Sequence, residues 1–255
     1  MGNISDMDTG DLRPSAEERE DIFVTTRWTL VQRAGGSAPD ARAALEDICR
    51  TYWFPLYAYA RRRGKSPEDA EDLTQAFFVR LLEQRWIEDA NREKGQLRAF
   101  LITAMKRFML KEWRKASAQK RGGSVNILSI DAELAEGRYA GSVTPSLDAD
   151  ALFDRQWALT VLNATFQRLE TEFSRTAKSA EYSVLKESLV LTRESLNYAD
   201  IAARLEISEG AARVAVHRLR KRFREVYRAE VAHTLPVGAD VDEEARYLAV
   251  SLTKG

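Results

Sequence analysis

The sequence is poor in residues that form covalent or metal-linked structures. Its 255 residues include one cysteine, Cys49, and two histidines, His217 and His233. A single cysteine excludes an internal disulfide, and three such side chains do not make up the four ligands of a typical structural zinc site. We therefore expect neither a metal nor any other cofactor, and a reducing compartment.

Long hydrophobic runs are missing as well. Nowhere do about 18 apolar residues follow one another, so no membrane-spanning helix is expected. Residues 1–12 are polar and acidic and lack the basic and apolar regions of a signal peptide. With 44% hydrophobic and 31% charged residues, the composition is typical of a globular protein, which we expect in the cytoplasm without membrane insertion.

Alternating patterns typical of β-strands are also absent, whereas apolar residues recur at helical spacing almost throughout the chain. The expected fold class is therefore all-α, and the length suggests two domains. The predicted divisions are an acidic leader (1–21), a first helical domain (22–120), an acidic flexible linker (121–150), a second helical domain (151–228) and a C-terminal extension (229–255).

Local signals place the main helices. The run from Ser66 to Asp69 is a helix start, because serine caps, proline suits the first turn and carboxylates oppose the helix dipole. From it we expect a helix with Leu73, Phe77 and Leu81 facing inward, and then a long basic helix over 96–117. Pro55 is expected to bend the helix in which it lies, or to make that helix restart. The last predicted helix covers residues 241–252.

The formal net charge is zero, from 39 basic and 39 acidic residues, but the charge is unevenly distributed. Residues 92–121 hold ten basic and two acidic side chains, and residues 213–228 hold seven basic and one acidic. Residues 131–154, in contrast, hold six acidic side chains and one basic. Two basic helices that flank an acidic segment point to nucleic acid as a partner in spite of the neutral total.

Residues 197–224 have the pattern of a helix-turn-helix motif. A short helix over 198–205 would bury Ile201 and Ala202, and Ser208 would cap a second helix that buries a stripe starting at Ala212. The opposite face then suits a recognition helix in a major groove, with basic residues reaching phosphates. An ordinary pair of packed helices needs the same apolar spacing, but it leaves the basic face unexplained.

In the first domain, aromatic and basic residues alternate along the helix over 96–117. Cations that hold a nucleic-acid backbone beside aromatic rings are typical of single-strand binding. Phe100 and Phe108 are better explained as core residues, and Trp113 is open to both interpretations.

Three blocks together resemble regions 2 and 4 of bacterial RNA polymerase sigma factors of the extracytoplasmic-function (ECF) type. They are DAEDLTQAFF at 69–78, KGQLRAFL at 94–101 and the helix pair at 197–224. The resemblance covers about residues 41–228 and extends to the order and separation of the blocks. The leader and the tail exceed a minimal ECF factor and are similar to a subgroup with a C-terminal extension, for which we expect a regulatory role.

The resemblance implies two partners, core RNA polymerase and promoter DNA, and a further regulator such as an anti-sigma factor. Docking on the clamp helices of core would use Asp69, Asp72, Leu73, Gln75 and Phe78. Melting and reading of the minus-10 element would use Asn91, Arg92, Lys94, Arg98, Lys106, Arg107, Lys111, Trp113 and Arg114. Reading of the minus-35 element as duplex would use Ser208, Glu209, Gly210, Arg213, His217, Arg218 and Arg220. The acidic linker would run toward the active-site channel of the polymerase.

Other interpretations compete with this one. Glu206 stands at a turn position where the family usually has glycine, and Ala212 stands where it has valine. A helix-turn-helix regulator that binds duplex DNA without polymerase is the main alternative, and a scaffold for acidic proteins is another. An enzyme is disfavoured, because Gly64-Lys65-Ser66 follows no strand and lacks the first glycine of a phosphate-binding loop.

Overall fold

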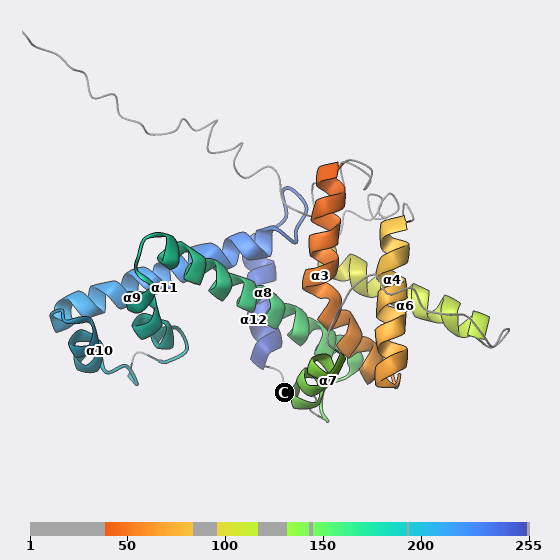
Figure 1. Ribbon diagram of the computed structural model, residues 1–255, viewed down its shortest axis with the longest axis horizontal. Helices are drawn as coiled ribbons and strands as arrows, with labels where there is room; N and C mark the ends of the chain where they lie inside the picture. The colour runs from red at the N-terminus through yellow and green to blue at the C-terminus, as the bar shows by residue number, and fades with distance from the viewer. Residues whose placement is uncertain (1–38, 84–95, 117–131, 143–144, 193, 254–255) are drawn as a thin grey trace, which may run out of the picture.

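The computed structural model describes residues 39–83, 96–116, 132–142, 145–192 and 194–253 (Figure 1). Within these ranges every regular element is a helix, which confirms the predicted all-α class. Two expectations, the acidic leader and the loop that holds Asn91, Arg92 and Lys94, lie outside the described residues.

Three helices form most of the first lobe: α3 (Pro39–Arg62), α4 (Pro67–Glu83) and α6 (Leu97–Ala116). The start of α4 is the predicted one, since the Asp69 amide donates to Ser66 Oγ over 3.1 Å. The rings of Phe77 and Phe108 meet edge to face, with centroids 5.8 Å apart, and join α4 to α6. The inward faces predicted for these two helices are therefore confirmed.

The sequence predicts a bend or a restart at Pro55, and of these the restart is wrong, because α3 runs through this residue. Proline removes one backbone hydrogen bond from a helix. The neighbouring Phe54, Leu56 and Tyr57 are at most 7% exposed and belong to the core of the first lobe. Burial of these large side chains outweighs the loss of a single hydrogen bond.

The linker expected over 121–150 also needs a correction. Residues Ala132–Ser142 form a helix, α7, and Ala135 and Leu147 are buried in the first core. Glu136 binds this segment to α3, because it accepts hydrogen bonds from Tyr57 Oη and Arg61 Nη2, each over 2.6 Å. The charge of the segment suggested a solvated tether, but one of its acidic residues pairs with a cation of α3.

The remaining elements are α8 (Ala149–Arg175), α9 (Ser179–Leu185), the short 3₁₀ helix η2 (Lys186–Leu189), α10 (Tyr198–Leu205), α11 (Glu209–Ala232) and α12 (Val241–Thr253). Helix α12 confirms the amphipathic segment predicted at the end of the chain. Helix α10 has the predicted bounds, and α11 starts where predicted, with Ser208 Oγ accepting from the Ala211 amide over 3.2 Å as its N-cap. Helix α11 continues beyond the predicted motif to Ala232.

Two hydrophobic clusters divide the molecule, and the long helices α8 and α11 belong to both. The first part of α8 buries Phe153 and Trp157 in the first cluster, and its last part buries Leu169 in the second. At 1.5 Å per residue, the 27 residues of α8 span about 40 Å. The expected boundaries at 150 and 228 therefore do not separate the cores, and Leu248 of α12 packs into the first one. Figure 1 shows α8 running from the helices around α7 to those around α9.

Candidate polymerase and nucleic-acid interfaces

The acidic start of α4 has an exposed side and a buried side. Asp69 and Asp72 are exposed and Leu73 is half-buried. Gln75 and Phe78 are only 4% and 1% exposed, and Gln75 Nε2 donates to Glu71 Oε1 over 3.1 Å. Because Phe78 packs edge to face against Phe77 inside the core, direct docking through Gln75 or Phe78 is not possible in this structure. The exposed docking face is narrower than the sequence suggested.

The far end of α6 keeps the features of the predicted single-strand surface. Arg107, Lys111 and Arg114 are exposed there, and the Trp113 side chain is 66% exposed. An indole that protrudes beside cations can stack on an unpaired base. Trp113 therefore does not belong to the core, in contrast to Phe108, which is 1% exposed.

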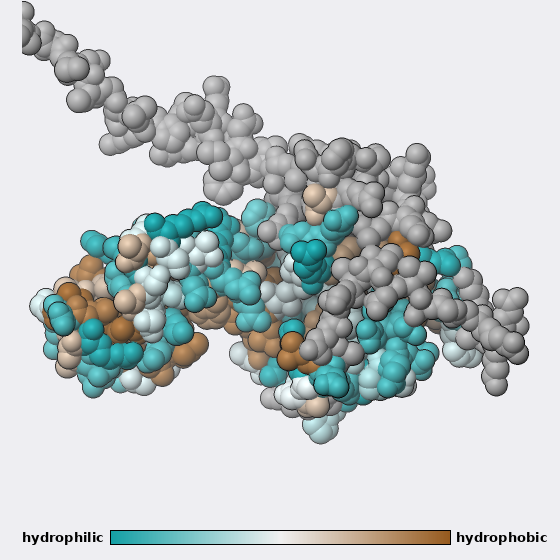
Figure 2. All heavy atoms as spheres, viewed as in Figure 1, coloured by the Kyte–Doolittle hydropathy of each residue, from teal (hydrophilic) through white to brown (hydrophobic). Residues whose placement is uncertain are grey.

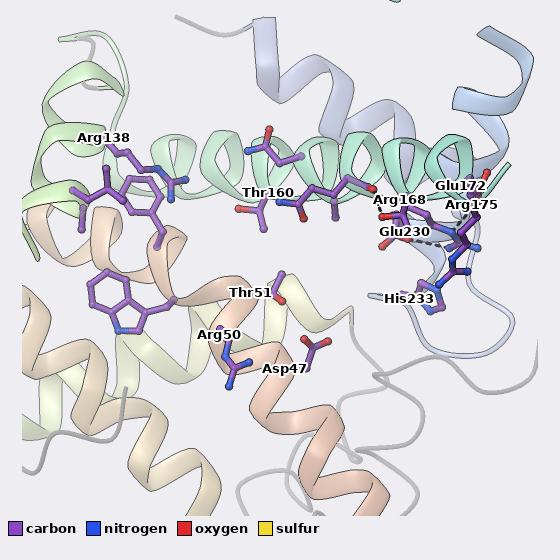
Figure 3. Close-up of a pocket in the computed structure, with 18 residues that line it drawn as sticks. Asp47, Arg50, Thr51, Arg138, Thr160, Arg168, Glu172, Arg175, Glu230 and His233 are labelled. Atoms are coloured by element: carbon purple, nitrogen blue, oxygen red, sulfur yellow. Dashed lines mark hydrogen bonds and ion pairs between the residues drawn. The ribbon is translucent and has the colours of Figure 1, made fainter. Parts of the chain in front are cut away.

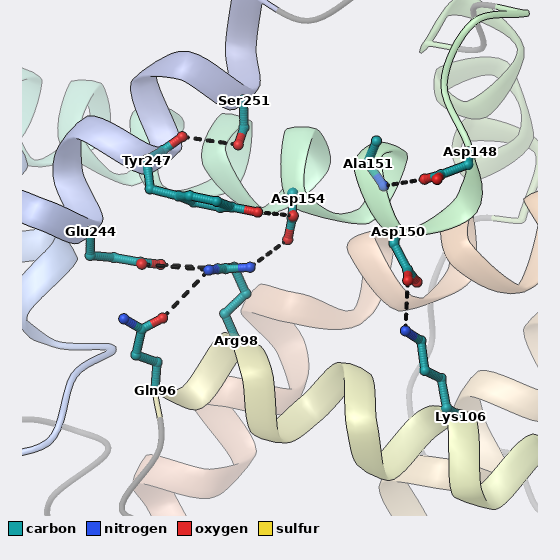
Figure 4. A network of polar contacts seen from close by, with 10 residues as sticks. All are labelled: Gln96, Arg98, Lys106, Asp148, Asp150, Ala151, Asp154, Glu244, Tyr247 and Ser251. Carbon is teal, nitrogen blue, oxygen red and sulfur yellow. Dashed lines mark hydrogen bonds and ion pairs between the residues drawn. The ribbon is translucent and has the colours of Figure 1, made fainter.

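The beginning of α6 is covered by acidic side chains (Figure 4). Arg98 Nη1 binds Asp154 Oδ1 over 2.6 Å, and Arg98 Nε binds Glu244 Oε1 over 3.0 Å. One turn before Asp154, Asp150 pairs with Lys106 over 2.7 Å. Arg98 is 13% exposed, so in this form it cannot contact DNA as predicted, and Lys106 is shared with a carboxylate.

Burial and pairing act on Arg98 in opposite directions. Burial alone would lower the pKa of its guanidinium, but the hydrogen bond and the charge of Glu244, with the charge of Asp154, raise this pKa overall. The guanidinium also lies 4.3 Å from the centroid of the Tyr247 ring. Acidic side chains of α8 and α12 thus keep Arg98 of α6 charged in an environment that little water reaches.

The outward face of α11 carries most of the residues predicted to read the minus-35 element. Ser208, Glu209, Gly210, Arg213, His217 and Arg218 are all exposed. A Cβ added at Gly210 would meet no atom within 4 Å, so the backbone there lies open. Arg213 pairs with Glu209 over 2.6 Å and lies 4.4 Å from the centroid of the Tyr198 ring. Tyr198 is a contact that the sequence pattern did not single out.

Arg220 has a structural role that the sequence did not predict. Its Nη2 donates to the carbonyl oxygens of Ser188 and Leu191 over 2.7 and 2.6 Å. These hydrogen bonds join α11 to η2 and to the residues that follow it. Because both acceptors are backbone atoms, no sequence pattern could identify them. A phosphate contact by Arg220 would compete with these bonds.

A cleft of about 970 Å³ lies between α3, α7, α8 and α11 (Figure 3). At one end Arg168 binds Glu230 over 3.0 Å and Glu172 over 3.5 Å. At the other end the Arg138 guanidinium lies 3.8 Å from the centroid of the Phe54 ring. Its walls carry charges of both signs, which favour neither anions nor cations. The residues come from four helices, which explains why no motif revealed the cleft.

Two searches of the described part of the chain gave negative results. No group of three or more potential metal ligands occurs there. No helix in the same part is long and apolar enough to cross a membrane.

The fold and these surfaces define an all-α protein with basic faces on two separate helices. The basic face of α6 lies beside the exposed Trp113, and the basic face of α11 belongs to the helix pair α10–α11. Residues 50–119 match the family model of sigma-70 region 2, a stretch that covers the second half of α3 and all of α4 and α6. The match supports a member of the sigma-70 family, and region 2 implies a role in promoter recognition with core RNA polymerase and promoter DNA as partners. Comparisons with curated proteins and with solved structures returned no match.

Proposed function

We propose that the chain is an ECF-type sigma factor with a C-terminal extension. It binds core RNA polymerase through the exposed start of α4, opens and reads the minus-10 element with α6 and the loop before it, and reads the minus-35 element with α11. The single observation that carries this proposal is the region 2 match over residues 50–119. An anti-sigma factor or another regulator is a further expected partner.

The exposed end of α6 supports the minus-10 part of the proposal. Strand separation requires that unpaired bases be held, and aromatic side chains beside cations do this at modest cost because every base can stack. Trp113, Lys111 and Arg114 supply these groups within one turn of α6.

The helix pair α10–α11 supports the minus-35 part. A capped helix whose first turns are exposed can enter a major groove, and residues there reach base edges. Glu209, Arg213 and His217 recur at intervals of four residues on this open face. The main alternative, a helix-turn-helix regulator that acts without polymerase, uses the same face.

Transcription with purified core RNA polymerase distinguishes the two functions. The full chain is added to core with a pool of promoter fragments, and the transcripts are mapped. We expect initiation from a subset of fragments that neither core nor the chain produces alone. Tight duplex binding without core, combined with no transcript from any fragment, would support the regulator instead.

A double charge reversal, Asp69→Lys with Asp72→Lys, tests the docking face in the same assay. Both side chains are exposed, so the fold should persist while the affinity for core falls about tenfold or more, as expected for charge pairs at an interface. Glu170→Lys, an exposed acidic position on α8, serves as the control. Equal core affinity of the double variant and the control would refute docking through α4.

A further inference from the structure

Arg98 lies where three segments distant in sequence meet. Its guanidinium comes from α6, Asp154 comes from α8, and Glu244 and Tyr247 come from α12 (Figure 4). Tyr247 Oη donates to Asp154, so the two acidic partners of Arg98 are themselves tied together through α12. The nearby Leu97 amide donates to the Thr234 carbonyl oxygen over 2.9 Å, which fixes the start of α6 against the chain before α12.

The members of this cluster depend on one another because little water reaches them. The side chains of Arg98, Asp154 and Glu244 are 13%, 17% and 3% exposed. A charge at such a position is stable only while its partner is present, since its loss leaves an uncompensated buried ion. Within the described residues Glu244 forms its ion pair with Arg98, so the position of α12 and the pairing of Arg98 are coupled.

Helix α12 packs one face on the first core, where Ala245 and Leu252 lie beside Leu248. Leu248 is fully buried in the first core, and Arg228 of α11 pairs with Asp242 at the start of α12. Tyr247 and Val250 remain 39% and 53% exposed. Helix α12 has 13 residues and contributes to the first core alone, whereas α8 and α11 contribute to both, so α12 can open locally at a lower free energy than global unfolding requires.

The acidic groups around α6 also have the chemistry of the ligand that α6 is proposed to bind. A carboxylate that pairs with arginine presents two anionic oxygens, as a backbone phosphate does. Glu244 and Asp154 occupy the guanidinium of Arg98, and Asp150 occupies Lys106. The covered half of α6 therefore resembles a nucleic-acid site that is filled by the protein's own carboxylates.

We propose that α12 is an intramolecular latch that competes with nucleic acid for Arg98. With α12 in place, Glu244 and Tyr247 hold Arg98 against α8, and only the far end of α6, around Trp113, is open. Release of α12 takes Glu244 and Tyr247 away from Arg98 and leaves Asp154 of α8 as its paired carboxylate. The side of the guanidinium that faced α12 is then open to a phosphate, which lengthens the basic face of α6 toward its beginning. The inference rests on the proposed function only in taking promoter DNA as the competing polyanion.

The test compares two neutralising substitutions on α12 in the full chain. Glu244→Gln removes the charge that pairs with Arg98, and Glu243→Gln makes the same change at the exposed neighbouring position, outside the Arg98 cluster. Hydrogen exchange of residues 241–253 reports the attachment of α12. Binding of a fluorescent single-stranded DNA oligonucleotide at several salt concentrations, without polymerase, reports the availability of Arg98.

For Glu244→Gln we expect exchange in α12 about tenfold faster than in the wild type. We also expect oligonucleotide binding about three- to tenfold tighter, with a steeper salt dependence from one additional phosphate contact. Glu243→Gln should match the wild type in both measurements. Tyr247→Phe, which removes only the hydrogen bond to Asp154, should give smaller changes in the same direction and replaces Glu244→Gln if the latter does not fold.

Two results would overturn the latch. In the first, Glu244→Gln and Tyr247→Phe match Glu243→Gln in both measurements, so that α12 does not depend on the cluster. In the second, α12 exchanges faster but oligonucleotide affinity is unchanged, so that Arg98 is not a competing site. Neither measurement contains polymerase. Failure of the wild type to start transcription would therefore refute the sigma function and leave the latch standing.

Discussion

Glu206 ends α10 in a left-handed backbone conformation, with φ 55° and ψ 40°. This conformation costs a residue with a Cβ about 1 to 2 kcal/mol, whereas glycine adopts it without that cost but loses more entropy on folding. We expect Glu206→Gly to raise the free energy of unfolding by about 0.5 to 1 kcal/mol. Urea unfolding measures the change.

Ala203→Gly is the control for this substitution, because it places glycine inside α10 where the backbone is helical. It should lower the free energy of unfolding by about 1 kcal/mol. A loss of stability in both variants would mean that the Glu206 side chain contributes more than its backbone conformation costs.

Arg213 is held in place before any DNA arrives, by Glu209 on one side and the Tyr198 ring on the other. If it reads a base, Arg213→Ala should weaken binding to the preferred minus-35 sequence by about 1 to 3 kcal/mol and relax the preference at one position. Lys221→Ala, an exposed basic position farther along α11, should weaken binding to all sequences alike. Binding to a library of minus-35 duplexes separates the two outcomes, and a uniform loss for Arg213→Ala would assign it to phosphate.

At the scale of elements, the Glu136 carboxylate forms the ion pair between α7 and α3. The hydrogen bond from Arg61 is the main cause that lowers the pKa of Glu136, and Tyr57 adds a second hydrogen bond. A lowered carboxylate pKa means that the ionised form stabilises the folded protein. This stabilisation is present above the pKa of about 4.3 of the unfolded chain and is lost as the pH falls through the lower pKa of the folded form.

Glu136→Gln should therefore lower the free energy of unfolding by about 1 to 2 kcal/mol at pH 7. The difference from the wild type should shrink as the pH falls below about 4. Glu133→Gln, at an exposed position on the same helix, should change stability little at either pH. Denaturant unfolding of the three proteins at pH 7 and pH 3.5 tests this, and a pH-independent difference would show that packing and not charge attaches α7.

At the scale of the whole molecule, the two hydrophobic clusters are joined by continuous helices. Because α8 and α11 each contribute to both clusters, one cluster cannot unfold without fraying helices that support the other. The stack of Tyr52 on Trp157, with ring centroids 3.8 Å apart, ties α3 to α8 and strengthens this link. Two domains on a flexible tether would instead unfold independently.

Leu169→Ala tests this cooperativity from the second cluster, where Leu169 is fully buried. The cavity should cost about 2 to 5 kcal/mol and lower a single transition that tryptophan fluorescence and far-ultraviolet circular dichroism report alike. The two tryptophans described as buried, Trp53 and Trp157, both lie in the first cluster. Their fluorescence therefore reports on the unfolding of the first cluster, whereas the substitution is in the second. Fluorescence that keeps the wild-type midpoint while the helical signal shifts would show two independent units.

Local sequence signals and hydrophobic periodicity determine the positions of many of the helices. The Ser66 cap, the stripe through Phe77 and Leu81, the bounds of α10 and the start of α11 depend on residues within a few turns of one another, so the sequence predicts them. The match to sigma-70 region 2 is likewise a property of the sequence.

The tertiary structure decided which polar side chains meet across long separations. Arg98 and Glu244 are 146 positions apart, and Arg61 and Glu136 are 75 apart. The sequence gives the sign of each charge, but it does not distinguish an acidic segment that is solvated from one that pairs with a distant cation. Only the packing of α7, α8 and α12 against the first core determines that Arg98 is covered, that Phe78 is internal and that Trp113 stays exposed, because burial depends on all neighbouring helices together.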